Sequence, residues 1–445
     1  MQKNILEKKI GFISLGCDKN RVDLEYMIAH IKKAGFQITA NENDANIIIV
    51  NTCAFLQSSR EESIKELENL KKLKEKKLEK VIMTGCLTRY SASLKEELDP
   101  LIDAVLLIKE NSKIVDLIYS LYNLKVKICE YEPYSRILTT PSHIAYIKIS
   151  EGCDNKCSYC AIPNIRGKFV SRPKEDIVKE AKFLANCGVQ ELIVVAQDVT
   201  KYGVDLYGKN QLIELLQEFE KINGFKWIRL HYCYPELITD ELIDYIADNN
   251  NKVVKYIDVP FQHISNNVLK AMNRKNTQEE AYILVKKLKD KGISIRSTFI
   301  VGFPGEDEND FNLLIKFLKE SKMDNVGFFA YSREKGTKAY DMPNQIDESL
   351  KIKRLNKAQK VQSKIYEEKQ KEKIGKTFDV ILDEQTDEQK VFVGRTEYNS
   401  YDVDSIVYVK LKKKHKLGDI IKVKITDTYK IDLIGEEKWK IFQTF

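Results

Sequence analysis

The stretch Glu151-Gly152-Cys153-Asp154-Asn155-Lys156-Cys157-Ser158-Tyr159-Cys160-Ala161-Ile162-Pro163 places three of the chain's nine cysteines on one short loop. Three thiolates with the spacing C-x3-C-x2-C can each hold one iron of a [4Fe–4S] cubane, which leaves the fourth iron without a protein ligand. A zinc site favours two C-x2-C pairs or added histidines, and neither pattern occurs here. The spacing therefore predicts an iron–sulfur site whose open iron can bind a substrate or cofactor.

Length and composition limit the class of protein. A chain of 445 residues with 43% hydrophobic residues should fold into about three domains with packed cores. No apolar run reaches the roughly 18 residues that span a bilayer, and no signal-peptide core is found near Met1, so we expect a cytoplasmic protein without a membrane partner. An odd number of cysteines in such a chain favours metal ligation over disulfides. The net charge of +7 permits contact with nucleic acid or the ribosome but does not require it.

Residues 8–125 alternate between strand-like and helix-like patterns. The alternation predicts a parallel sheet flanked by helices. The predicted strands are 9–14, 47–51, 81–84 and 104–107, and the predicted helices are 22–34, 60–78 and 112–124.

Three further cysteines, Cys17, Cys53 and Cys86, each follow a predicted strand of this first part. The carboxyl ends of parallel strands meet at one edge of a sheet, where ligand sites form. We therefore expect the three thiols to converge on a second cluster. The alternative is that each is a small buried hydrophobic residue.

Residues 139–370 continue the alternation with six candidate strands. Six βα units predict an open or partial TIM-like barrel, with chemistry at the carboxyl ends of its strands. The cysteine loop follows the first strand. The run Gly302-Phe303-Pro304-Gly305-Glu306 follows the fifth, where glycines permit close approach to a ligand, although an ordinary turn would use the same residues. The predicted strands are 145–149, 192–196, 227–230, 256–259, 297–301 and 327–331.

The last part, 373–445, follows a Lys-rich helix and has period-2 alternation, which predicts a small antiparallel β-barrel. Over 372–445 the basic and acidic residues are equal in number, 14 of each, whereas a barrel that grips RNA should carry a basic face. Lys410–Lys416 could supply such a face locally, but Glu397, Asp402 and Asp404 argue against one elsewhere. The predicted strands are 377–382, 391–395, 405–409, 421–425 and 438–442.

Taken together, the two cysteine sets and the terminal barrel make the chain resemble the methylthiotransferases of the radical S-adenosylmethionine (radical SAM) superfamily. The order of parts matches: an amino-terminal methylthiotransferase domain (8–125), a radical SAM core (139–370) and a TRAM module (373–445). The run from Cys160 through Arg166-Gly167 to Ser171-Arg172 is particularly similar. The runs Ser14–Glu25 and Gly394–Tyr408 resemble the RimO branch, although Asp18 stands where that branch usually has Pro.

The resemblance implies roles for individual residues. One [4Fe–4S] cluster would be held by Cys153, Cys157 and Cys160 and would cleave SAM. A second, auxiliary [4Fe–4S] cluster would be held by Cys17, Cys53 and Cys86 and would present sulfur. Contacts with SAM are expected from Tyr159, Gln197, Asp198, Gly302 and Glu306. The remaining thiols, expected to be ordinary core residues, are Cys129, Cys187 and Cys233.

The implied reaction adds a methylthio group to the β-carbon of an aspartate in ribosomal protein S twelve, with two molecules of SAM. The partners would be that protein or the small ribosomal subunit, and an electron donor that the sequence does not identify. One alternative is a tRNA methylthiotransferase of the MiaB or MtaB type, which modifies carbon 2 of an adenosine. The acidic TRAM stretch disfavours tRNA because phosphate-rich RNA would be repelled there. The other alternative is a non-catalytic iron–sulfur redox sensor.

Overall fold

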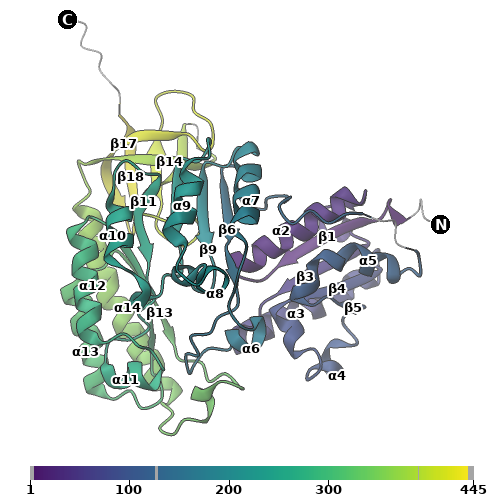
Figure 1. Cartoon of the computed structure of the whole chain (residues 1–445), viewed down its shortest axis with the longest axis horizontal. Coiled ribbons are helices and arrows are strands. Elements are labelled where there is room, and N and C mark those ends of the chain that lie inside the picture. Colours follow the sequence, from purple (N-terminus) through teal and green to yellow (C-terminus); the bar gives the residue numbers. More distant parts are fainter. Residues whose placement is uncertain (1–4, 126–128, 389, 439–445) are drawn as a thin grey trace, which may run out of the picture.

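The computed structural model describes residues 5–125, 129–388 and 390–438. Three parts follow one another along the chain. Figure 1 shows the amino-terminal sheet with its helices at one side, the larger central part beside it, and the strands β14, β17 and β18 above the central part. Among the described residues, no helix is both long and apolar enough to cross a membrane.

The amino-terminal part is a five-stranded sheet in the order β2-β1-β3-β4-β5, and all its pairings are parallel, as the alternation predicted. Its central strand β3 is buried on both faces, which explains the unbroken apolar run Ile47–Val50. Ile48 packs with Leu67 of α3, whereas Ile49 packs with Met27 of α2. The strands are β1 Lys9–Ser14, β2 Gln37–Ile38, β3 Ile47–Thr52, β4 Lys80–Gly85 and β5 Ala104–Val105; the helices are α2 Asp18–Lys33, α3 Gln57–Lys74, α4 Lys95–Leu98 and α5 Ile114–Ser120.

The central part is a six-stranded parallel sheet in the order β13-β12-β11-β10-β9-β6, which confirms the six predicted strands and the open barrel. Its strands are β6 Ile144–Lys148, β9 Glu191–Val195, β10 Trp227–Leu230, β11 Val253–Asp258, β12 Ser294–Val301 and β13 Asn325–Ala330; a short ribbon is formed by β7 Ser150–Glu151 and β8 Val170–Ser171. The helices are α6 Ile162–Arg166, α7 Lys174–Asn186, α8 Val204–Tyr207, α9 Leu212–Glu220, α10 Asp240–Ala247, α11 Asn266–Ala271, α12 Gln278–Asp290, α13 Glu308–Ser321 and α14 Glu348–Lys371.

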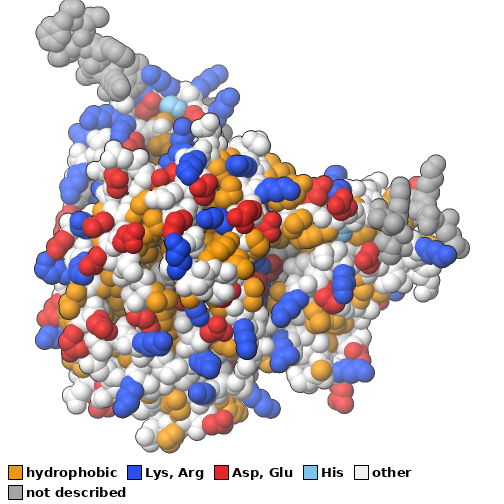
Figure 2. All heavy atoms as spheres, in the orientation of Figure 1, with side chains coloured by type: hydrophobic (Ala, Val, Ile, Leu, Met, Phe, Trp, Pro, Cys, Tyr) orange, Lys and Arg blue, Asp and Glu red, His pale blue; other side chains and the backbone are white. Residues whose placement is uncertain are grey.

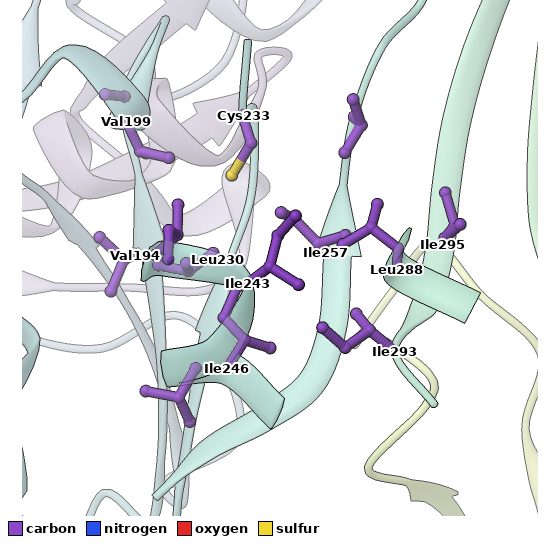
Figure 3. Packing of buried hydrophobic residues seen from close by; sticks show 14 of the residues in the cluster. Val194, Val199, Leu230, Cys233, Ile243, Ile246, Ile257, Leu288, Ile293 and Ile295 are labelled. Atoms are coloured by element: carbon purple, nitrogen blue, oxygen red, sulfur yellow. The ribbon is translucent and has the colours of Figure 1, made fainter. Parts of the chain in front are cut away.

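Alternate residues of the central strands face different neighbours. On the outer face, Val194 and Ile257 pack with Ile243 of α10 and Leu288 of α12 (Figure 3). On the inner face, Tyr146 packs with residues of α2, which belongs to the amino-terminal part. The helix α2 therefore lies over the inside of the open barrel. This contact positions the cysteines of the amino-terminal part relative to the cysteine loop of the central part.

The last part is a closed five-stranded barrel in the order β14-β15-β16-β18-β17. Four of its pairings are antiparallel, and the pairing of β16 with β18 is parallel. The fifth strand is Asp432–Glu437; the predicted strand 438–442 falls almost wholly outside the described residues. The strands are β14 Thr377–Gln385, β15 Val391–Thr396, β16 Val407–Lys410, β17 Ile420–Tyr429 and β18 Asp432–Glu437.

A buried ionic joint attaches the barrel to the core. Glu191 of β9 accepts hydrogen bonds from Arg229 (2.7 Å) and from Arg395 of β15 (2.6 Å), and all three side chains are at most 1% exposed. Burial acts to raise the pKa of Glu191, but the two guanidiniums outweigh it and hold that pKa at about 2. Arg395 also pairs with Asp383 (2.6 Å), and Asp383 in turn contacts His143 of the core (3.0 Å).

The acidic stretch of the barrel belongs to this joint, which corrects its interpretation as a free acidic face. Asp404 is buried against the core, where it pairs with Arg296 (2.6 Å) and accepts from the Tyr256 hydroxyl (2.8 Å). The backbone carbonyl of Glu397 accepts from Arg229 (2.8 Å). Of the three acidic residues, Asp402 has the most exposed side chain described here, at 61%, and it lies 3.6 Å from Arg21 of α2.

Candidate active site

The loop that carries Cys153, Cys157 and Cys160 lies beyond the carboxyl end of β6, as predicted. The chain turns sharply at Gly152, where φ is +76° and an added Cβ would lie 2.1 Å from the Lys168 carbonyl oxygen, so a side chain is excluded. Backbone and side-chain bonds fix the loop at both ends. The Cys153 amide donates to the Gly167 carbonyl (3.2 Å), and Ser158 donates through its amide to Met272 and through its hydroxyl to Ala271.

The three cysteines of this loop are half-buried, and a guanidinium lies near one of their sulfurs. The Tyr234 hydroxyl is 2.9 Å from the Cys157 sulfur, and the Arg274 guanidinium stacks on the Tyr234 ring and lies 3.9 Å from the same sulfur. Burial raises the pKa of the Cys153 thiol to about 11 and that of Cys160 to about 12. These thiols are protonated at neutral pH, so iron binding must release their protons.

The cysteines of the amino-terminal set also come together. Cys17, Cys53 and Cys86 follow β1, β3 and β4, which are neighbours in the sheet. The link between them is Asn20: its side-chain oxygen accepts from the thiols of Cys17 (3.7 Å) and Cys86 (3.6 Å). Its amide donates to the carbonyl of Thr52 (2.9 Å), the residue before Cys53. Asn20 therefore contacts the sulfurs of Cys17 and Cys86 and the backbone next to Cys53, and the second cluster expected at these three thiols remains a prediction.

A glycine makes the close approach of two of these loops possible. Gly85, which precedes Cys86, has φ +87°, and an added Cβ would lie 2.4 Å from the Thr52 carbonyl oxygen. The Thr52 hydroxyl donates to the Thr84 carbonyl (2.6 Å) and accepts from the Leu87 amide (3.2 Å), so the ends of β3 and β4 are held together.

One guanidinium lies between the two cysteine sets. Arg166 ends α6, directly after the cysteine loop, and its side chain is 2% exposed. It donates to the side-chain oxygen of Asn20 and lies 3.6 Å from the Cys86 sulfur. It also pairs with Asp23 of α2 (2.9 Å) and with Glu151 (3.1 Å), two residues before Cys153. The sequence alone points to no role for Arg166 or Asn20; the only signal is that each stands close to a cysteine in the chain.

The residues predicted to contact SAM past β9 lie on the same side of the barrel as the cysteine loop. Gln197 donates to Glu151 (3.0 Å), and its side-chain oxygen is buried without a partner. Asp198 is buried and accepts from Asn155 of the cysteine loop (2.9 Å) and from Thr200 (2.5 Å). Burial raises the pKa of Asp198. The free oxygen of Gln197 is available to a ligand.

The residues predicted to contact SAM past β12 differ from those past β9, because they bond mainly to other parts of the protein. Gly302 has φ +72°, and an added Cβ would lie 2.4 Å from the Lys351 side chain. Glu306 accepts from the Gly302 amide (2.8 Å) and pairs with Arg354 of α14 (2.9 Å), so its carboxylate braces the turn. Tyr159 packs against residues that include Met272 and Phe303. The SAM contacts of all three residues remain predictions.

The state and grouping of the cysteines fit the binding of clusters. All nine cysteines are free, so no ligand of either set is lost to a disulfide. Cys233 is a core residue, as expected and as Figure 3 shows, but Cys187 is exposed and Cys129 half-buried, so that expectation was wrong for these two. In the described residues, no three Cys, His, Asp or Glu side chains converge tightly enough to hold a single metal ion. A cubane takes each cysteine on a different iron, and two sets of three thiols fit that requirement.

Family models match each part of the chain. The Radical SAM superfamily matches residues 147–318, Uncharacterized protein family UPF0004 matches 9–106, and the TRAM domain matches 374–437. An open parallel barrel with a three-cysteine loop after its first strand thus defines a radical SAM enzyme.

Relatives identify the family. The chain is 46% identical to the ribosomal protein uS12 methylthiotransferase RimO of Clostridioides difficile (strain 630), over 97% of this chain and 99% of that protein. It is 45% identical to the protein of the same name from Thermoanaerobacter sp. (strain X514), over 96% of this chain and 100% of that protein. The chain belongs to the RimO family of methylthiotransferases, as the resemblance implied.

Solved structures agree with the fold. The radical S-adenosylmethionine methyltransferase TsrM from Kitasatospora setae has a TM-score of 0.51 at 14% identity, over 73% of this chain and 75% of that one. The cobalamin-dependent S-adenosylmethionine radical enzyme OxsB has a TM-score of 0.52 at 13% identity, over 82% of this chain and 58% of that one. At these identities the similarity concerns the fold alone.

Proposed function

We propose that this chain methylthiolates the β-carbon of an aspartate in ribosomal protein uS12 and uses two molecules of SAM per product. One SAM gives its methyl group to the sulfur atom that is to be transferred and leaves S-adenosylhomocysteine. The other is cleaved by one electron from an external donor and gives methionine and a 5′-deoxyadenosyl radical, which takes a hydrogen atom from the aspartate. The names of the relatives support this substrate.

The observation that carries the proposal is the position of the two cysteine sets. Arg166 reaches the Cys86 sulfur of one set and, through Glu151, the base of the loop that holds the other. A hydrogen-abstracting site and a sulfur-bearing site must act on the same carbon atom, so they must face one space. A chain with a single electron-transfer centre would not need this arrangement.

The cysteines of both sets would hold two [4Fe–4S] clusters, one that reduces SAM and one that carries the sulfur to be transferred. Arg274 would partly neutralise the charge of the cluster held by Cys153, Cys157 and Cys160, and the Tyr234 hydroxyl would donate a hydrogen bond to the Cys157 sulfur. Gln197, with its free buried oxygen, would orient SAM beside that cluster. We also take 8–125, 139–370 and 373–445 as the three domains of the enzyme.

The choice of a protein over tRNA as substrate rests on the surface charges as well as on the relatives. An RNA-binding face should concentrate basic side chains. On the face of the molecule shown in Figure 2, acidic and basic side chains are interspersed over the core and the barrel. Such a surface provides no continuous track for a phosphate backbone.

The test is a turnover assay with anaerobically reconstituted protein, SAM, dithionite and either uS12 or hypomodified tRNA. We expect about eight irons per chain, a methylthio mass gain on uS12, and one equivalent each of S-adenosylhomocysteine and 5′-deoxyadenosine per product. Modification of tRNA with uS12 left untouched would refute the substrate. If no SAM is cleaved, the result would favour a non-catalytic redox sensor.

Cysteine variants separate the two roles. Replacing Cys153, Cys157 and Cys160 by Ala should remove half of the iron and all 5′-deoxyadenosine. Replacing Cys17, Cys53 and Cys86 by Ala should remove methylthiolation while SAM cleavage persists. Cys187→Ala, at an exposed thiol, is the control and should change neither iron content nor product. Wild-type iron content in the first variant would show that the ligand assignment is wrong.

A further inference from the structure

Arg166 is a buried cation that belongs to the radical SAM part of the chain but contacts the other cysteine set. Its helix α6 begins two residues after Cys160. Its side chain nevertheless extends to Asn20 of α2 and to the Cys86 sulfur at 3.6 Å. The amino-terminal part supplies all three cysteines of that set, so a donor from another part of the chain is not needed merely to build it.

The charges around Arg166 explain why a guanidinium can be buried here. Asp23 and Glu151 each pair with both Arg166 and Lys148, so two carboxylates face two cations. This balanced group holds Arg166 in place, because a buried guanidinium with only one acceptor would be costly. A guanidinium has five N–H donors in a fixed fork, and this leaves donors that can face Asn20 and the Cys86 sulfur.

We propose that Arg166 is a positioning residue for the amino-terminal cysteine set, and that its donation to the Cys86 sulfur raises the reduction potential of the cluster held there. This inference rests on the proposed function, in which Cys17, Cys53 and Cys86 hold that cluster. Hydrogen bonds to ligand sulfurs and nearby positive charge stabilise the reduced, more negative form of a cluster. The helix that follows the SAM-cleaving loop thereby sets the electrostatics of the sulfur-bearing site.

Arg136 provides a matched control. Its guanidinium is 1% exposed and also joins α2 to the core, since it pairs with Glu25 of α2 (2.5 Å) and Glu180 of α7 (2.6 Å). Another of its donors goes to the Tyr146 carbonyl (2.6 Å), and none is given to a sulfur among the described residues. Arg136→Gln therefore removes a buried cation from the same helix contact without removing a donor to a cysteine.

The test is a redox titration followed by electron paramagnetic resonance on the full chain with Cys153, Cys157 and Cys160 replaced by Ala, so that only the amino-terminal cluster gives a signal. Arg166→Gln in this background should shift the midpoint potential to a more negative value. Arg166→Lys, which keeps the charge but not the fork, should give a smaller shift. Arg136→Gln should leave the potential unchanged.

The outcomes distinguish this inference from the proposed function. A background variant that binds no iron would overturn the cluster assignment and the inference with it. Full iron content with an unchanged potential in Arg166→Gln would overturn only the inference. An equal shift in Arg136→Gln would show a general effect of the domain contact and would also overturn it. If Arg166→Gln loses its cluster, Arg166→Lys decides: an unshifted potential refutes the inference, and a negative shift supports it.

Discussion

Replacing Glu191 by Gln should loosen the joint between the barrel and the core. The carboxylate accepts one charge-assisted bond from Arg229 and one from Arg395, with all three side chains at most 1% exposed. Gln has nearly the same shape, but its NH2 group must face one guanidinium, and no negative charge remains between the two. Hydrogen bonds to charged groups contribute about 1.5–3 kcal/mol each. The free energy lost with two such bonds agrees with the loss of about 3–5 kcal/mol expected when a buried ion pair is broken.

The chain contains a reporter for this change. Trp227 is 8% exposed and packs with Val254 and Tyr256 of the core and Ile381 of the barrel, so its fluorescence should respond when the barrel leaves. Trp439→Phe makes it the only tryptophan, since the chain has two. With a slope of about 2 kcal/mol per molar urea, a loss of 3–5 kcal/mol lowers the midpoint by about 1.5–2.5 M.

A surface substitution supplies the comparison. Glu436→Gln breaks a pair with Lys412 in which both side chains are more than 40% exposed, so it should cost at most about 1 kcal/mol. If Glu191→Gln and Glu436→Gln shift the urea midpoint equally, the buried joint does not stabilise the docked barrel, and the reasoning is refuted.

The other predictions concern pH, the acidic stretch and the loop after β4. A carboxyl whose pKa is lowered by folding contributes stability that is complete above its unfolded pKa of about 4.3 and is lost as the pH falls through its folded pKa. With Glu191 at about 2, barrel docking should weaken between about pH 4 and pH 2, and Glu191→Gln should lack this part of the acid transition. Asp404→Lys should lower the urea midpoint strongly, because it places a second cation against the Arg296 guanidinium at a buried position, whereas Asp402→Lys should change it little; the reverse order would contradict the buried position of Asp404. Gly85→Ala should lose iron from the amino-terminal set, while Gly188→Ala, which has a similar φ of +94° but open space for a Cβ, should keep it, as an iron assay would show.

The sequence predicted strands such as β3 and β9 well because their apolar runs are buried on both faces. It predicted α2 less well and began that helix at residue 22, whereas the helix begins at Asp18. The first turn, Asp18-Lys19-Asn20-Arg21, reads as solvent-exposed loop. In the structure Lys19 and Asn20 are buried, because α2 lies between its own sheet and the open barrel. No local pattern signals a helix that is covered by a second domain.

The candidate site likewise has one part that the sequence predicted and one part that it did not. The placement of Cys17, Cys53 and Cys86 after three neighbouring strands follows from strand order, which is readable in the alternation of the chain. The bond from Arg166 to Asn20 joins residues 146 positions apart and belongs to the packing of two domains. Both residues stand near a cysteine in the sequence. Their contact, however, depends on the relative orientation of the two domains, which only the folded chain defines.

The stretch 394–404, which carries Glu397, Asp402 and Asp404, helps to hold helix α2 in place. Ser400 contacts His231 of the core (2.7 Å), and His231 lies 3.8 Å from Asp18 of α2. Tyr401 packs in the cluster formed by α2 and the inner face of the sheet. The barrel therefore holds the end of α2 that carries Cys17 and Asn20, and it does so mainly through buried bonds, which salt screens little. The proposed function requires two cysteine sets that face one space, and this third support serves it, because α2 is then fixed by its own sheet, by the core and by the barrel.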